Sequence, residues 1–165
     1  MLQNIPAGTH CLIDANIFYY HLVETPLLSE ACSDFLERVE REEIVGHTAA
    51  VAVAEAIHKV MLAEVVARYA LPRQGLVHRL QRDRELIAGL TEHLKVPVLI
   101  KQLNIEVEAV TLPLLEQAAT ISTKLRLLTN DSLMVAVLEK LEIKNLVTND
   151  DDFDSASGVV TWKPR

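Results

Sequence analysis

The sequence predicts an α/β fold of three layers, in which a short parallel sheet lies between two layers of helices. Short apolar runs, such as residues 11–13 and 145–148, alternate with longer segments whose apolar residues recur at helical spacing. This alternation is typical of parallel strands that are buried on both faces. The length of 165 residues and the hydrophobic content of 50% suit a single domain, residues 1–165, with its own core.

The first half of the chain is expected to contain two strands and three helices. In order, these are a strand at 11–13, a short helix at 17–22, a helix at 28–39, a strand at 44–46 and a helix at 49–69. Pro26 limits the short helix, because a proline disfavours helical backbone in the residue before it. Thr48 is expected to cap the last helix. That helix is apolar almost all round, which predicts that it is buried or packs against a partner chain.

The second half is expected to begin with a helix at 73–94, which forms a protruding hairpin with the helix before it and ends at Pro97. A strand should follow, and β-branched residues just before Pro113 favour 106–111 over 98–100. The remaining elements are a helix at 114–125, a helix at 131–141 with Asn130 as its N-cap, a strand at 145–148 and an edge strand at 159–162.

The charge distribution allows two interpretations. The net charge of −7 argues against binding of nucleic acid by an extended basic surface. Residues 58–84 nevertheless contain six bases and two acids. This stretch therefore either holds a phosphate backbone beside an acidic centre or forms a solvated helix face.

Several features predict a cytoplasmic protein. No apolar stretch is long enough to span a membrane, and no signal peptide is recognisable at the N-terminus. Cys11 and Cys32 both have apolar neighbours, so we expect buried thiols rather than a disulfide.

Three aspartates are expected at one edge of the sheet. Asp14 and Asp150 each follow a strand, and Asp131 opens a helix. Each has a structural explanation of its own, as a helix cap, a turn residue or a partner of the helix dipole. However, the carboxyl ends of parallel strands meet at one edge, where ligands bind. Carboxylates that converge there repel one another unless a cation lies between them.

Glu55 is a fourth candidate for this site, because it lies inside the apolar helix that follows the second strand. An ionised side chain in such a setting is costly unless it is paired or bound to metal. Lys59, four residues on, offers an ordinary ion pair, and a position near the strand ends offers a metal-binding role. Oxygen ligands favour Mg²⁺ or Mn²⁺ over zinc.

Four motifs together resemble the PIN-domain family, which includes the VapC-like toxin ribonucleases. They are LIDAN at residues 12–16, Ala54-Glu55, TNDSL at residues 129–133 and LVTNDDDF at residues 146–153. The resemblance implies a PIN-like fold and cleavage of single-stranded RNA with Mg²⁺ or Mn²⁺. The segment 73–101 is longer than expected for a compact toxin of this type.

The resemblance also implies roles for individual residues. The core acids, both catalytic and metal-binding, would be Asp14, Glu55, Asp131 and Asp150, with Asp152 as an auxiliary metal ligand and with Thr148 and Asn16 orienting the ligands. The extra carboxylate Asp151 leaves open which of the three consecutive aspartates are ligands.

The implied partners are a single-stranded RNA substrate and, if the protein is a toxin, an antitoxin protein. The apolar helix 49–69 adds the expectation of a homodimer. One alternative is a non-catalytic PIN-like binding module that acts through a protein partner. Another is an Asp-centred phosphatase or phosphotransferase, which Asn16 disfavours because it stands where a second acid would be expected. A Gly-rich phosphate loop is absent from the sequence.

Overall fold

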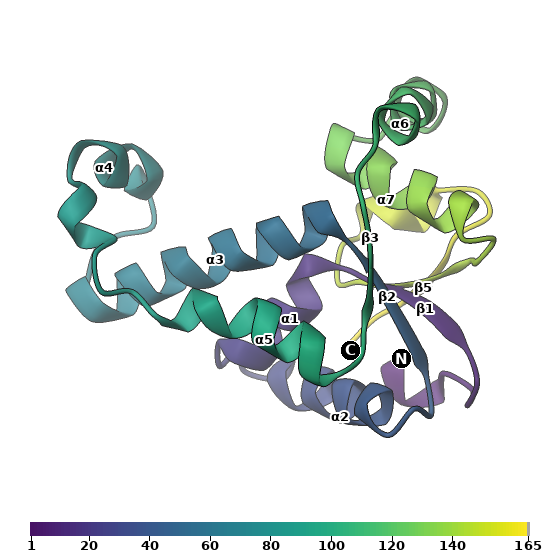
Figure 1. Cartoon of the computed structure of the whole chain (residues 1–165), viewed down its shortest axis with the longest axis horizontal. Helices are drawn as coiled ribbons and strands as arrows, with labels where there is room; N and C mark the ends of the chain where they lie inside the picture. The colour runs from purple at the N-terminus through teal and green to yellow at the C-terminus, as the bar shows by residue number, and fades with distance from the viewer. Residues whose placement is uncertain (165) are drawn as a thin grey trace.

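A five-stranded parallel sheet forms the centre of the protein (Figure 1), seen in a computed structural model that describes residues 1–164. The strands are β1 (His10–Ile13), β2 (Val45–Ala49), β3 (Glu106–Glu108), β4 (Asn145–Val147) and β5 (Val160–Trp162). Their order across the sheet is β3-β2-β1-β4-β5, and every neighbouring pair is parallel. The chain moves outward from β1 to β3 and then returns to the other side of β1. The order of strands therefore reverses between β1 and β4, the place where open α/β sheets bind ligands.

Helices cover both faces of this sheet. They are α1 (Ala15–Leu22), α2 (Ser29–Glu40), α3 (Ala50–Tyr69), α4 (Leu76–Arg82), α5 (Lys95–Gln102), α6 (Leu112–Leu125) and α7 (Thr129–Lys140), with short 3-10 turns at Leu2–Asn4, Arg84–Leu86, Glu92–Leu94 and Asp152–Ser155. Figure 1 shows α1, α2 and α5 on one side of the sheet and α6 and α7 on the other. The three-layer α/β fold predicted from the sequence is confirmed.

The central strands supply the middle of the core. Leu12, Ile13, Leu146 and Val147 are fully enclosed, as expected for strands with a helix layer on each face. In α7, every residue of the run 132–138 is buried, because this helix packs against α6 and its apolar residues join the main core. Complete burial of such an aliphatic side chain contributes about 1.5–3 kcal/mol to stability. The strand ends that precede Asp14 and Asp150 therefore lie in the buried core.

The last two turns of α3 and the chain that follows it form an arm, which we define as residues 61–90. It projects from the body of the molecule at the far end of α3 (Figure 1). It has a small core of its own, formed by Val65, Leu76, Leu80 and Leu90. The predicted protruding hairpin is thus present.

The predicted length of the second hairpin helix, residues 73–94, is wrong. The helix α4 ends at Arg82, and Gly89 adopts a positive φ of 80° that helical backbone does not permit. The prediction that Pro97 ends this segment is also wrong. Pro97 lies in the first turn of α5, where its missing N–H has no helical partner to lose.

Two predicted helix caps are wrong as well. Thr48 belongs to β2, and its hydroxyl donates to the carbonyl of Ile13 at 2.8 Å instead of capping α3. The helix α7 begins at Thr129, so Asn130 is not its N-cap and Asp131 is its third residue. Asp131 still lies in the first turn, where the helix dipole favours a carboxylate.

Cys11 and Cys32 are buried free thiols, as predicted. Within residues 1–164, no helix is both long enough and apolar enough to cross a bilayer.

Candidate functional site

The first two acids of the site are brought together by the pairing of β1 with β4. Ile13 and Val147 are partners in that ladder, so the residues that follow them leave the sheet side by side. The backbone N–H of Asp14 donates to the carbonyl of Val147 at 3.0 Å, which extends the pairing by one step. Asp14 then starts α1 as its N-cap. Asp150 follows β4 after a two-residue turn.

Two more acids reach the same place from helices that begin at this edge. Glu55 lies in the second turn of α3, and Asp131 lies in the first turn of α7. All four acids line one pocket of about 40 Å³, together with Asn16, Val51, Ala52, Lys59, Asn130 and Met134. The structure therefore gathers Asp14, Glu55, Asp131 and Asp150, as the sequence predicts.

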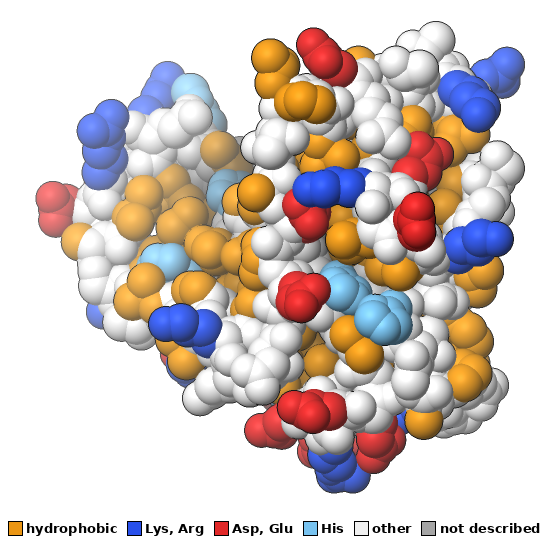
Figure 2. Space-filling model, turned by 45° about the vertical axis from the view of Figure 1, so that its right-hand side comes forward, with side chains coloured by type: hydrophobic (Ala, Val, Ile, Leu, Met, Phe, Trp, Pro, Cys, Tyr) orange, Lys and Arg blue, Asp and Glu red, His pale blue; other side chains and the backbone are white. Residues whose placement is uncertain are grey.

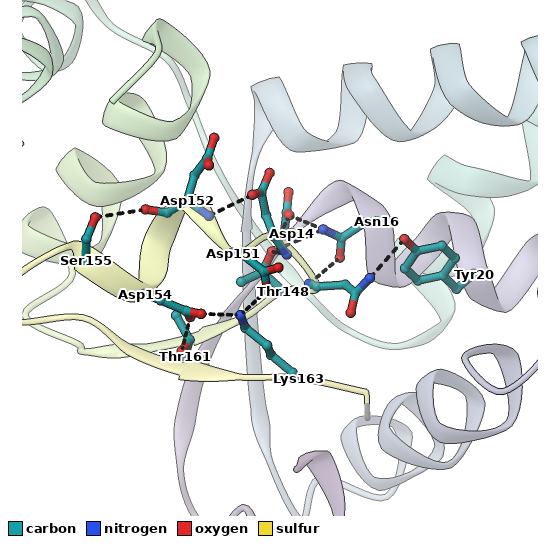
Figure 3. Close-up of polar contacts among 12 residues, drawn as sticks. Asp14, Asn16, Tyr20, Thr148, Asp151, Asp152, Asp154, Ser155, Thr161 and Lys163 are labelled. Atoms are coloured by element: carbon teal, nitrogen blue, oxygen red, sulfur yellow. Dashed lines mark hydrogen bonds and ion pairs between the residues drawn. The ribbon is translucent and has the colours of Figure 1, made fainter. Parts of the chain in front are cut away.

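Three donors fix the carboxylate of Asp14. One oxygen accepts from the backbone N–H of Ala15 at 2.6 Å, and the other accepts from Asn16 Nδ2 at 2.6 Å and from the Thr148 hydroxyl at 2.7 Å (Figure 3). Thr148 is completely buried and Asn16 is nearly so. Asp14 thus has one orientation, set by buried neighbours.

The turn after β4 is tied to the same residues. The Thr148 hydroxyl accepts from the backbone N–H of Asp150 at 3.0 Å, and Asn16 Oδ1 accepts from the backbone N–H of Asn149 at 3.2 Å. The carboxylate of Asp150 accepts from the backbone N–H of Asp152 at 2.9 Å. Asn16 and Thr148 therefore position the acids on both strands.

The three consecutive aspartates have different surroundings. Asp150 lines the acidic pocket. Asp151 forms an ion pair with Lys163 at 2.6 Å (Figure 3). Asp152 lies outside the residues that line the acidic pocket and borders a separate hollow near the start of α7. Its charge nevertheless reaches Asp131, whose pKa it helps to raise.

Lys59 also lines the pocket. The sequence indicated this residue only as an ion-pair partner for Glu55. Its Nζ lies 2.7 Å from Glu55 Oε1. Burial lowers the pKa of Lys59, but the hydrogen bond and charge of Glu55 and the charge of Asp14 outweigh it, so the pKa is raised. Its spacing of four residues from Glu55 was the available signal, because residues i and i+4 share a helix face.

The acids disturb one another electrostatically. Burial and the neighbouring charges of Asp150 and Asp14 raise the pKa of Asp131 to about 6. Burial also raises the pKa of Asp14, although hydrogen bonds from Thr148 and Ala15 act in the opposite direction. Burying two like charges close to each other without a counter-charge costs free energy. The ionised forms of Asp14 and Asp131 are therefore disfavoured in the pocket as it stands.

The raised pKa of Asp131 predicts a pH dependence of stability. Protonation favours the folded state, so this contribution is complete below pH 3.8 and is lost as the pH rises through about 6. Because the side chain is partly exposed, we expect no more than about 1 kcal/mol. In chelator, Asp131→Asn should therefore stabilise the protein at pH 7 more than at pH 4.5, as measured by urea unfolding. An equal effect at both pH values would contradict this origin of the pKa shift.

The acids do not form a complete ligand set as they stand. Within the part of the chain that the structure describes, no three His, Cys, Asp or Glu side chains are arranged closely enough to enclose a metal ion. The Glu55–Lys59 pair accounts for part of this, since it holds one carboxylate on a cation of the protein itself. Apart from Lys59 and the thioether of Met134, the polar groups that line the pocket are carboxylates and side-chain amides, whose oxygens suit a hard divalent cation.

Comparison with solved structures shows the same fold in toxin–antitoxin proteins. VapC20 of Mycobacterium tuberculosis, a sarcin–ricin loop cleaving toxin, aligns with a TM-score of 0.60 and 17% identity over 89% of this chain and 95% of that chain. The VapBC2 complex of Rickettsia felis, bound to promoter DNA, aligns with a TM-score of 0.58 and 13% identity over 93% and 98%. A toxin–antitoxin complex from Klebsiella pneumoniae aligns with a TM-score of 0.52 and 17% identity over 94% and 98%.

Sequence comparison identifies the family. No curated protein sequence matches this chain. The model of the PIN domain matches residues 11–159, a span that includes β2, β3, β4 and all of β1 except its first residue, and that ends just before β5. It contains every acid of the pocket. The chain belongs to the PIN-domain family.

Proposed function

We propose that this protein is a divalent-metal-dependent endoribonuclease that cleaves single-stranded RNA. The observation that carries the proposal is the convergence of Asp14, Glu55, Asp131 and Asp150 on one pocket at the β1–β4 edge. Carboxylates at such a position are suited to hold Mg²⁺ or Mn²⁺, which would activate a water for attack on a phosphodiester and stabilise the departing oxygen. The described residues that line the pocket include no histidine, and the proposal assigns a histidine no catalytic role.

Asp14, Asp131 and Asp150 are the residues that we propose to hold the cation. Asp14 offers a carboxylate whose orientation is fixed by buried donors. Glu55 joins them when its carboxylate turns from Lys59 towards the pocket, or it acts through a bound water. Asp152 would act at longer range, because it contributes charge at Asp131 without lining the pocket.

The substrate and partners follow from the same reasoning. An unpaired strand or loop is the best substrate, because the bases of an A-form duplex are poorly accessible. The similarity to VapC20 and VapBC2 supports a role as the toxin of a toxin–antitoxin pair, with an antitoxin as protein partner.

We also propose a homodimer, because α3 is strongly apolar. A clean monomer by light scattering at micromolar concentration would contradict the dimer.

A direct assay tests the nuclease proposal. The purified protein is incubated with end-labelled single-stranded RNAs of varied sequence in Mg²⁺, in Mn²⁺ and in EDTA. We expect internal cleavage with either metal, none in EDTA, and slow cleavage of the same sequences in a perfect duplex. If a folded protein that takes up Mn²⁺ cleaves none of these RNAs, the nuclease proposal fails and the PIN-like binding module becomes the better explanation.

A further inference from the structure

A second hollow lies directly beside the acidic pocket, and we propose that it is a nucleotide subsite. In this proposal, which rests on the proposed function, an unpaired RNA base lies against Tyr19 and Tyr20 while Lys59 and Arg73 contact the flanking phosphates. The hollow has a volume of about 270 Å³ and is lined by α1, by α3 and, in the part of the arm that follows α3, by Arg73 and Leu76. It shares Asn16 and Lys59 with the acidic pocket, so the two lie next to each other.

The lining combines the two kinds of group that bind single-stranded nucleic acid. Tyr19 and Tyr20 supply aromatic rings, packed edge to face with centroids 5.6 Å apart. Aliphatic side chains of α3 line the same hollow, namely Leu62, Ala63 and Val66. Lys59 lies at the end next to the acids and Arg73 is exposed at the arm. Aromatic faces accept any base by stacking, and neighbouring cations hold the backbone.

A chain of hydrogen bonds connects this hollow to the reactive acids. The Tyr20 hydroxyl accepts from Asn149 Nδ2 at 3.3 Å, and the backbone N–H of Asn149 donates to Asn16 Oδ1 at 3.2 Å. Asn16 in turn donates to Asp14 at 2.6 Å (Figure 3). The Tyr20 ring is thus held in a fixed place relative to Asp14. A base that lies on this ring would place the adjoining phosphate towards the acidic pocket.

Charge on the arm favours a polyanion as the occupant. Arg68, Arg73, Arg79, Arg82 and Arg84 are all exposed on the arm, in a protein whose overall charge is −7. Figure 2 shows Lys and Arg side chains on the arm beside a face where hydrophobic side chains gather. Lys59 also offsets the repulsion between a phosphate and the carboxylates at the boundary of the two pockets. An acidic protein segment would form ion pairs with these arginines but would not use the aromatic rings of Tyr19 and Tyr20.

The proposed subsite predicts that the bases of an RNA contribute to binding independently of its phosphates. Binding of a fluorescent hepta-uridylate is compared with binding of the same length of abasic ribose phosphate, by anisotropy in EDTA and low salt. Wild-type protein should prefer the oligonucleotide with bases by about tenfold or more, since base stacking on aromatic residues has this magnitude. Tyr20→Leu and Tyr19→Leu should reduce the preference to near unity, while Tyr20→Phe should keep it. Arg73→Gln should weaken binding of both oligonucleotides equally.

The controls separate this proposal from the nuclease proposal. Tyr69→Leu removes a tyrosine from the end of α3, outside the hollow, and should leave the preference unchanged. Equal binding of the two oligonucleotides by wild-type protein, or no detectable binding of hepta-uridylate at 1 mM, would overturn the subsite even if the enzyme cleaves RNA. A tenfold preference in a protein that shows no metal-dependent cleavage would support the subsite and reject the nuclease.

Discussion

Asp14→Asn should reduce metal-dependent RNA cleavage by about 10³-fold, because loss of a charged metal ligand removes several kcal/mol of transition-state stabilisation. The amide has the shape of the carboxylate but no charge, so the pocket keeps its outline and loses its best-oriented anion. Initial rates on one single-stranded RNA in Mn²⁺ measure the effect. Undiminished cleavage by the folded variant would reject Asp14 as a ligand.

The Asp14→Asn variant should still fold. The amide loses charge-assisted hydrogen bonds from Asn16 and Thr148, but it also removes the cost of burying a charge, the main reason why the pKa of Asp14 is raised. Circular dichroism melting establishes this. Asp34→Asn is the matched control, since Asp34 is exposed on α2 and lines neither the acidic pocket nor the proposed subsite. Its activity should equal that of the wild type.

Thr148→Val should lower both stability and activity. The buried hydroxyl donates to Asp14 and accepts from Asn16 Nδ2 and from the backbone N–H of Asp150. Valine has the same shape and replaces none of these bonds, so buried polar groups on both strand ends lose a partner. We expect the free energy of unfolding to fall by about 2–3 kcal/mol, and kcat to fall about 10- to 100-fold because the ligands lose their support. Urea unfolding and cleavage rates provide the two measurements.

The control for this prediction is Thr148→Ser, which keeps the hydroxyl and removes one methyl group. It should cost about 1 kcal/mol of stability and leave kcat within a few-fold of the wild type. If serine and valine reduced kcat equally, packing of the side chain rather than its hydrogen bonds would position the acids.

The acidic pocket could be predicted from the sequence because simple topology determines it. Asp14 and Asp150 each follow a short apolar run, and parallel strands place such residues at one edge. Glu55 was identified by its apolar neighbours, in a helix that begins at the same edge. The switch between β1 and β4, which brings the first two acids together, depends on strand order and could be inferred only through the family resemblance.

The arm and its surroundings could not be predicted as well, because the relevant contacts are not local. Apolar residues continue at helical spacing from 76 to 94, yet the backbone turns at Gly89 and the chain packs back on α3. Tyr20 and Asn149 are 129 positions apart, so no sequence pattern links them. Helix geometry alone indicates that Lys59 lies near Glu55 and therefore in the pocket. Its position between two hollows follows only from the three-dimensional structure.

We propose that carboxylates far apart in the sequence hold one hard cation at the β1–β4 edge. The anomalous scattering of manganese in crystals soaked with Mn²⁺ tests it most directly. We predict a peak bounded by the carboxylate oxygens of Asp14, Asp131 and Asp150, at about 2.1 Å from each oxygen that ligates directly. Manganese bound elsewhere, with no peak in this pocket at saturating Mn²⁺, would contradict the claim.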